Sequence, residues 1–203
     1  MENKELQDNP LNEKESIELI ARMIRNTQRG LARGAGTPML LWGYATLAAT
    51  AAVWLAARLT ADDRWNYLWF MIPLIGLPGM LFCRKRTPGV HTYIDRVIRY
   101  VWFVLGTTGF MLSMLSIASS MWALPILFII ILIMGMGSVL TGLVIEFKPM
   151  IIGGTAGMLV SIPHYLVSGY DIKMLTFALA FAAMYIIPGH ILNRKARNAC
   201  SAN

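Results

Sequence analysis

Three polar side chains in an apolar stretch are the first candidates for chemistry: Ser161, His164 and Tyr165. A histidine inside such a run is a functional hypothesis by default, because an imidazole can relay a proton or hold a ligand near neutral pH. A neutral histidine that packs against its surroundings and hydrogen-bonds to a neighbour is the more frequent case. Ser161, Tyr165 and Ser168 are near enough in sequence to be its partners.

A second group of side chains has the chemistry of metal ligands: Cys83, His91, His190 and Cys200. Their spacings match no zinc pattern, so we predict neither a metal nor a cofactor. The sequence also lacks a phosphate-binding loop, an HExxH helix and a GxSxG elbow. No pair of carboxylates lies inside its apolar runs. These absences predict a protein that is not an enzyme, and they count against a coupled ion transporter, which usually carries a buried Asp or Glu.

The segments that position these side chains are themselves apolar, most clearly residues 121–145. That run contains 25 residues and no charged side chain, and a helix of about 20 apolar residues crosses a hydrocarbon core of about 30 Å. The whole chain is 56% hydrophobic and 14% charged, whereas a soluble domain has about 25% charged residues. Backbone polar groups in lipid must bond within their own segment, so the spans should be helices. The sequence predicts an all-α, polytopic integral membrane protein.

Six apolar runs follow one another along the chain, separated by short polar turns. They predict six transmembrane helices in three hairpins, and prolines and glycines should kink the second helix. The predicted spans are residues 39–57, 65–83, 99–119, 121–145, 149–167 and 174–192.

The polar N-terminal segment, residues 1–38, contains a predicted amphipathic helix over residues 13–33. Its apolar stripe recurs at steps of three, four and seven residues and consists of Ile17, Ile20, Ile24 and Leu31. A basic stripe lies on nearly the opposite face and consists of Arg22, Arg25, Arg29 and Arg33. Residues 34–38 should end the helix in a turn, so that it lies on the membrane surface and its arginines reach anionic lipids. The alternative is a free cytoplasmic helix that pairs with another protein through the apolar stripe.

The distribution of basic residues predicts the orientation. Of the 18 Lys and Arg residues, 15 lie in the N-terminal segment, in the second and fourth turns with their flanks, and in the basic tail of residues 193–203. The other three are Arg58, Arg64 and Lys173. Because cytoplasmic loops are enriched in Lys and Arg, both termini should be cytoplasmic, and an even number of spans requires them to share a side.

Small residues predict where the spans approach one another closely. Gly153 and Gly157 form a small-xxx-small pair, which lets a neighbouring helix come near the backbone. Gly137 and Gly142 lie in the second half of the fourth span. We therefore expect these four glycines at helix–helix contacts.

The first and third hairpins share two short patterns. Residues 38–43 are similar to residues 149–154, and residues 78–85 are similar to residues 188–195, at offsets of 111 and 110. Parallel repeats related by an axis along the membrane normal would give this pattern. Apolar spans with basic exits would also give it, by composition alone.

Three motifs together resemble a known group of proteins: NEKES at residues 12–16, GAGTP running into LWGY over residues 34–44, and YIDRV at residues 93–97. The chain resembles a family of uncharacterised small bacterial inner-membrane proteins over most of its length. The resemblance implies a six-span protein of the bacterial inner membrane, and it implies no activity.

The sequence therefore predicts a non-enzymatic membrane module that binds a partner or senses the membrane through its cytoplasmic face. The expected partners are the lipid bilayer, anionic lipids at that face and a cytoplasmic protein, with no nucleic acid. The alternative is a small transporter or channel built from repeated hairpins, in which His164 would line the pathway. A membrane enzyme acting on lipid is a third hypothesis, weakened by the lack of an acid–base pair.

Overall fold

The first helix is longer than the sequence pattern predicts. The computed structural model describes residues 13–60, 62–86, 93–118 and 125–201, and it leaves out the side chains of residues 13–14, 24–35, 63, 83–86, 118 and 196–201. Helix α1 runs as one element from Glu13 to Thr60 and contains Pro38. The predicted turn at residues 34–38 is therefore wrong.

Contacts with the C-terminal helix account for the unbroken course of α1. A proline inside a helix removes one backbone hydrogen bond, and each glycine costs about 1 kcal/mol relative to alanine. Gly36 lies against the side chain of Asn193, and Gly189 lies against Leu40 and the Gly36 carbonyl. These glycines let the two helices approach closely, so packing offsets the poor local propensity.

The remaining described elements are also helical, and 95% of the structure is helix with no strand among the described residues. The prediction of an all-helical protein with several apolar helices is thereby confirmed. In chain order the elements are the 3₁₀ helix η1 (Asp63–Phe70), α2 (Met71–Arg86), α3 (Tyr93–Ala118), α4 (Ile126–Val144), α5 (Lys148–Leu166), α6 (Tyr170–Phe181), the π-helical turn η2 (Ala182–Ile186) and α7 (Ile187–Ser201).

Five stretches within the described residues are long and apolar enough to cross a membrane. They cover Gly36–Thr60, Arg64–Phe82, Tyr93–Ile117, Ile126–Val144 and Tyr170–Lys195. Helix α5 is as long as α4, at 19 residues, but its mean hydropathy is lower because it contains Lys148, His164 and two prolines. The structure thus shows five candidate spans where the sequence pattern predicts six.

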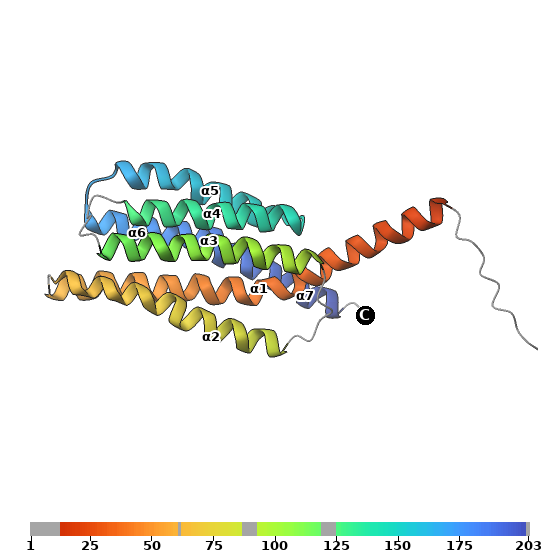
Figure 1. Ribbon diagram of the computed structural model, residues 1–203, viewed down its shortest axis with the longest axis horizontal. Helices are drawn as coiled ribbons and strands as arrows, with labels where there is room; N and C mark the ends of the chain where they lie inside the picture. Colours follow the sequence, from red (N-terminus) through yellow and green to blue (C-terminus); the bar gives the residue numbers. More distant parts are fainter. Residues whose placement is uncertain (1–12, 61, 87–92, 119–124, 202–203) are drawn as a thin grey trace, which may run out of the picture.

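Successive long helices run antiparallel, so that α1 begins and α7 ends at the same end of the bundle (Figure 1). We call this the terminal end. Helices α4 and α5 lie side by side, and α1 packs against α2, α6 and α7. Helices α2 and α3 are peripheral, since only 6% of each of their spans is buried inside the protein, compared with 33–44% for the other three.

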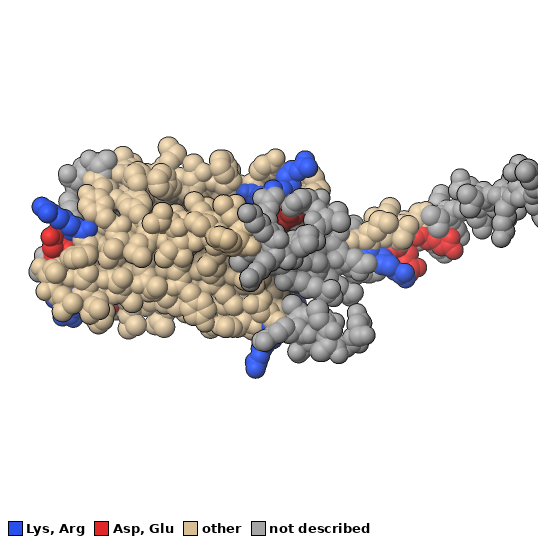
Figure 2. Space-filling view, turned by 90° about the horizontal axis from the view of Figure 1, so that it is seen from below, with Lys and Arg blue, Asp and Glu red and all other residues tan. Residues whose placement is uncertain are grey.

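Charged side chains gather at the two ends of the bundle and leave an uncharged band between them (Figure 2). The described charges at the terminal end include Arg96, Lys148 and Arg194, and those at the opposite end include Arg64 and Lys173. A hydrocarbon core excludes unpaired charge. The band is therefore the part of the surface that suits the interior of a bilayer.

The π-helical turn η2 has an identifiable cause in Pro188. A proline has no N–H, so it cannot bond the carbonyl of Met184 four residues earlier. The Ile187 N–H instead reaches back to the Ala182 carbonyl, five residues away, as in a π-helix. The hydroxyl of Ser138, on α4, donates to the Met184 carbonyl at 3.4 Å. A neighbouring helix thus satisfies the backbone group that the proline leaves free.

Candidate functional site

His164 lies inside the bundle, near the end of α5. Its side chain is buried, with 2% exposed, and its Nδ1 is 2.7 Å from the hydroxyl of Thr176 on α6. That hydroxyl also contacts the carbonyl of Ile172, at 2.8 Å, and that of Lys173. The Thr176 hydroxyl and His164 Nδ1 form one hydrogen bond, and the histidine tautomer decides which of the two atoms donates.

The other two members of the predicted polar group do not bond to His164. Ser161 is buried, but its hydroxyl donates to the Met158 carbonyl of its own helix at 2.6 Å. Tyr165 is 57% exposed and its ring lies on that of Phe128, with centroids 5.4 Å apart. The structure therefore does not join the three side chains in one hydrogen-bonded group. Thr176 could not be found from the sequence, because a turn separates it from α5.

Aromatic rings fill the interior beside His164. Phe177, Phe181 and Tyr185 are four residues apart along α6 and η2, so their rings lie one above another. The ring centroids are separated by 4.8 Å for the first pair and by 5.7 Å for the second. The His164 ring meets Phe177 at 6.5 Å, and Trp102 meets Tyr185 at 6.2 Å. The space around the histidine is thus occupied by side chains.

Two glycines of α5, Gly153 and Gly157, face η2. A Cβ atom added at Gly153 would lie 2.5 Å from the Ala183 carbonyl oxygen, whereas one added at Gly157 would meet only the flexible side chain of Met184. Backbone contact of this kind requires glycine at position 153.

The two glycines predicted in the fourth span also face other helices. A Cβ atom at Gly137 would lie 2.9 Å from Leu105 of α3, and one at Gly142 would lie 2.9 Å from the backbone nitrogen of Ile151. All four predicted packing glycines lie where another helix passes. Their role in stability remains a prediction.

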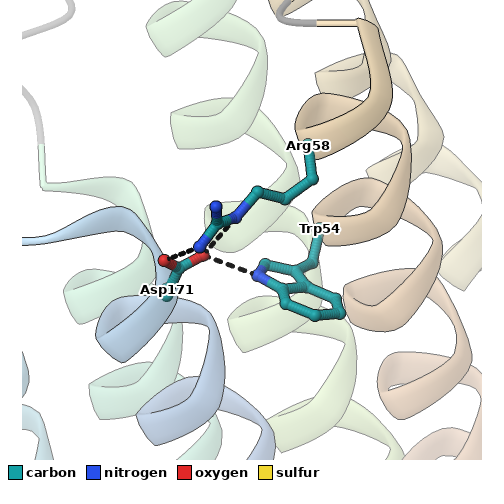
Figure 3. A network of polar contacts seen from close by, with 3 residues as sticks. All are labelled: Trp54, Arg58 and Asp171. Carbon is teal, nitrogen blue, oxygen red and sulfur yellow. Dashed lines mark hydrogen bonds and ion pairs between the residues drawn. The ribbon is translucent and has the colours of Figure 1, made fainter.

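A polar cluster at the opposite end of the bundle joins α1 to α6 (Figure 3). We call Trp54, Arg58 and Asp171 the Asp171 clamp. The Trp54 indole donates to Asp171 Oδ1 at 2.8 Å, and the Arg58 Nε donates to the same oxygen at 2.9 Å. A second Arg58 nitrogen pairs with Oδ2, so the carboxylate is held by a bidentate fork. Sequence reasoning treated Arg58 only as a loop charge and missed the clamp.

The N-terminal part of α1, residues 13–33, forms an arm that leaves the terminal end of the bundle (Figure 1). Ile17 and Ile20 of the predicted apolar stripe are 67% and 57% exposed. Glu18 and Arg22 pair at 3.6 Å one helical turn apart. Of the predicted basic stripe only Arg22 has a described side chain, and those of Arg25, Arg29 and Arg33 lie outside the description.

No protein family, curated protein or solved structure matches this chain. The resemblance to small bacterial inner-membrane proteins therefore stays a prediction. The candidate features are those that the structure itself brings together: the buried His164–Thr176 pair, the Asp171 clamp and the exposed arm.

Proposed function

We propose that the protein is a multi-pass protein of the bacterial inner membrane, with α5 as a sixth span and both termini in the cytoplasm. The antiparallel course of the helices supports this, since α5 lies beside α4, runs antiparallel to it and is aligned with the long axis of the bundle. The excess of Lys and Arg in the segments at the terminal end supports a cytoplasmic location for that end. In this arrangement the six spans pair as three consecutive hairpins.

We propose that its function is non-enzymatic, and that the arm docks a cytoplasmic protein. The observation that carries the proposal is the exposure of Ile17 and Ile20, the two described members of the apolar stripe, on a helix that projects beyond the bundle. Fully burying an isoleucine side chain is favourable by about 1.5–3 kcal/mol. Burial of Ile17 and Ile20 by a partner would therefore contribute substantially to the free energy of binding. Arg22 and the other arginines of the basic stripe favour a partner whose groove has an acidic rim.

The course of α1 favours a protein partner over the leaflet surface. An interfacial helix lies in the plane of the membrane, which requires a sharp turn where it meets the first span. Helix α1 continues through residues 34–38 without such a turn. The arm therefore continues from the first span and leaves the bundle at its terminal end, where a helix-in-groove contact can form.

The packed interior is a further reason to place the function on the arm. A transport pathway through His164 needs a wet, polar lining, whereas this histidine is covered by Thr176 and Phe177. No buried side-chain nitrogen or oxygen among the described residues lacks a hydrogen-bond partner. The buried polar side chains of the described residues thus already have hydrogen-bond partners within the protein.

Photo-crosslinking in cells tests the docking proposal. A photoreactive side chain at Ile20 should give a discrete protein adduct, because that position lies in the stripe that the partner covers. The same side chain at Arg22 is the control, since two residues turn it about 200° around the helix. Adducts of equal yield at both positions, or adducts to lipid alone at Ile20, would contradict the proposal.

The emission of a fluorophore at Ile20 distinguishes a protein partner from the lipid leaflet as the surface that buries the apolar stripe. In nanodiscs that contain only the purified protein, docking predicts a water-exposed label whose emission matches that of a label at Arg22. A blue-shifted emission at Ile20 in these nanodiscs would show that the leaflet covers the stripe and that the arm is an interfacial helix.

A further inference from the structure

A hydrogen-bonded pair of polar side chains faces outward where α1 meets α7. The hydroxyl of Tyr44 and Nε2 of His190 are 2.9 Å apart, and their rings meet edge to face with centroids 6.1 Å apart. Tyr44 is 50% exposed and His190 is also exposed. Both residues lie within stretches that are apolar enough to cross a membrane. A polar pair on a lipid-facing surface is costly unless its hydrogen bonds are satisfied.

Counting protons shows that this pair has one donor to spare. A neutral tyrosine and a neutral histidine carry two donor protons between them, the phenolic O–H and one ring N–H. Only one of these protons is used in the bond between Tyr44 and His190, whichever tautomer is present. The pair makes no other hydrogen bond to the described residues. The spare proton therefore has no acceptor among the described residues, and an oxygen of a ligand can supply one.

A cation lies one turn further along the same face. Arg194 follows His190 by four residues on α7, which puts the two side chains next to each other. Arg194 is exposed and forms no ion pair with a described residue. A guanidinium beside a spare donor is the arrangement that binds a phosphate group.

The surface on the side away from Arg194 suits an acyl chain. Along the outward face of α1, Tyr44 is followed by Ala48 and Ala51, which are both exposed and small. On α7, Ile187 is exposed one turn before His190. The polar pair thus separates a cation at the end of the bundle from a shallow apolar strip within the uncharged band.

We propose that Tyr44, His190 and Arg194 form a binding site for the headgroup of an anionic phospholipid in the leaflet at the terminal end. Arg194 pairs with the phosphate, and the spare donor of the Tyr44–His190 pair bonds a phosphate or ester oxygen. One acyl chain lies along Ala48 and Ala51. The site is separate from the arm and does not depend on the docking proposal.

Lipid titrations of the purified full chain test the site. Thermal unfolding in detergent is followed while phosphatidylglycerol, phosphatidylcholine or inorganic phosphate is added. We expect phosphatidylglycerol to raise the Tm at concentrations at least tenfold lower than phosphatidylcholine. Inorganic phosphate, which lacks acyl chains, should leave the Tm unchanged at the same concentrations. A matching shift with inorganic phosphate would identify the ligand as a free anion and overturn the lipid assignment.

Substitutions test whether the effect of phosphatidylglycerol on the Tm arises at this site. Arg194→Gln and Tyr44→Phe should each weaken the phosphatidylglycerol response about tenfold, and both positions are exposed enough to tolerate the change. Arg96→Gln is the matched control, because Arg96 is an exposed cation at the same end of the bundle but on α3. An equal loss with Arg96→Gln would mean that the lipid responds to net charge, and an unchanged response in both site variants would disprove the site. Neither result bears on crosslinking at Ile20, so the two proposals fail separately.

Discussion

At the scale of single residues, stability depends on a few places where only one side chain suits the surroundings. Gly153 is the clearest, because its neighbour is the carbonyl of Ala183 in the π-helical turn and cannot move as a side chain would. The turn exists because of Pro188, and Ser138 satisfies the freed carbonyl of Met184. Sequence patterns predicted small residues in α4 and α5. They could not predict which backbone atoms those residues would meet, because that depends on the relative placement of α5 and α7.

We predict that Gly153→Ala lowers the Tm in detergent, because the added methyl group overpacks a backbone contact. The expected loss in the free energy of unfolding is about 1–3 kcal/mol. Gly106→Ala is the matched control, since nothing lies within 4 Å of a Cβ atom at that position of α3. There the better helix propensity of alanine should leave the Tm unchanged or raise it. Equal effects of the two substitutions would show that helix propensity, not packing, sets the outcome.

His164 provides a second prediction at this scale. Thr176→Val removes the hydrogen-bond partner of the buried His164 Nδ1 while it preserves the shape of the side chain, and it should cost about 1–3 kcal/mol. Thr155→Val is the control, because Thr155 makes the same bond to its own helix, with Ile151, but is exposed. Thermal unfolding of both variants gives the comparison. A loss in Thr155→Val as large as that in Thr176→Val would show that the bond to His164 contributes nothing.

At the scale of elements, the main difference between prediction and structure is the length of α1. Two glycines and a proline within residues 34–38 are typical of a helix end, and local rules gave no reason to continue through them. The reason is tertiary, since α7 packs against this stretch through Asn193 and Gly189. The Asp171 clamp was missed for a related reason, because Arg58 and Asp171 are 113 residues apart and share no local pattern.

Continuity of α1 can be measured with a pair of spin labels. Labels at Ser16 and Thr37, in a background without Cys83 and Cys200, should be separated by about 32 Å with a narrow distribution, because a helix rises 1.5 Å per residue. Pulsed electron–electron resonance in nanodiscs gives this distance. A shorter and broader distribution would show that the arm folds back at the glycines.

The Asp171 clamp should hold α6 to α1 through charge. Asp171→Asn should lower the Tm by less than Gly153→Ala does, because the clamp is solvent-exposed and exposed ion pairs contribute little. The difference from the wild type should shrink in 1 M salt, since the screening length there is about 3 Å. Asp62→Asn, at the same end, is the control for the loss of one carboxylate. A difference for Asp171→Asn that does not change with salt would rule out an electrostatic role.

At the scale of the whole molecule, composition alone was sufficient for the helical class and for the division into charged ends and an apolar band. It was less informative about the number of spans, because Lys148, His164 and two prolines lower the mean hydropathy of α5. Contacts with other helices favour small and polar residues in such a segment, whereas contact with lipid favours large apolar ones. The structure shows that α5 packs along α4, and composition alone could not have revealed this contact.

Reporter fusions test the proposed six-span topology. Fusions at Asp62, Ser120 and Ser168 should behave as periplasmic, and fusions at Thr87, Lys148 and Ser201 as cytoplasmic, because each span reverses the side of the chain. The fusion at Lys148 is the decisive one, since it lies between α4 and α5. A fusion at Ser168 on the same side as one at Lys148 would mean that α5 does not cross the membrane.

The unbroken course of α1 has a mechanical consequence. A helix of 48 residues is about 72 Å long, and the proposed topology embeds one part of it in the bilayer while the other part extends into the cytoplasm. The helix would then pivot as one unit near Pro38, where it packs against α7. A small tilt or twist of the part inside the bilayer, caused by a change in bilayer thickness or lateral tension, would move the tip, because the helix is continuous between the two parts. Ile17 and Ile20 would then report the state of the membrane by their position.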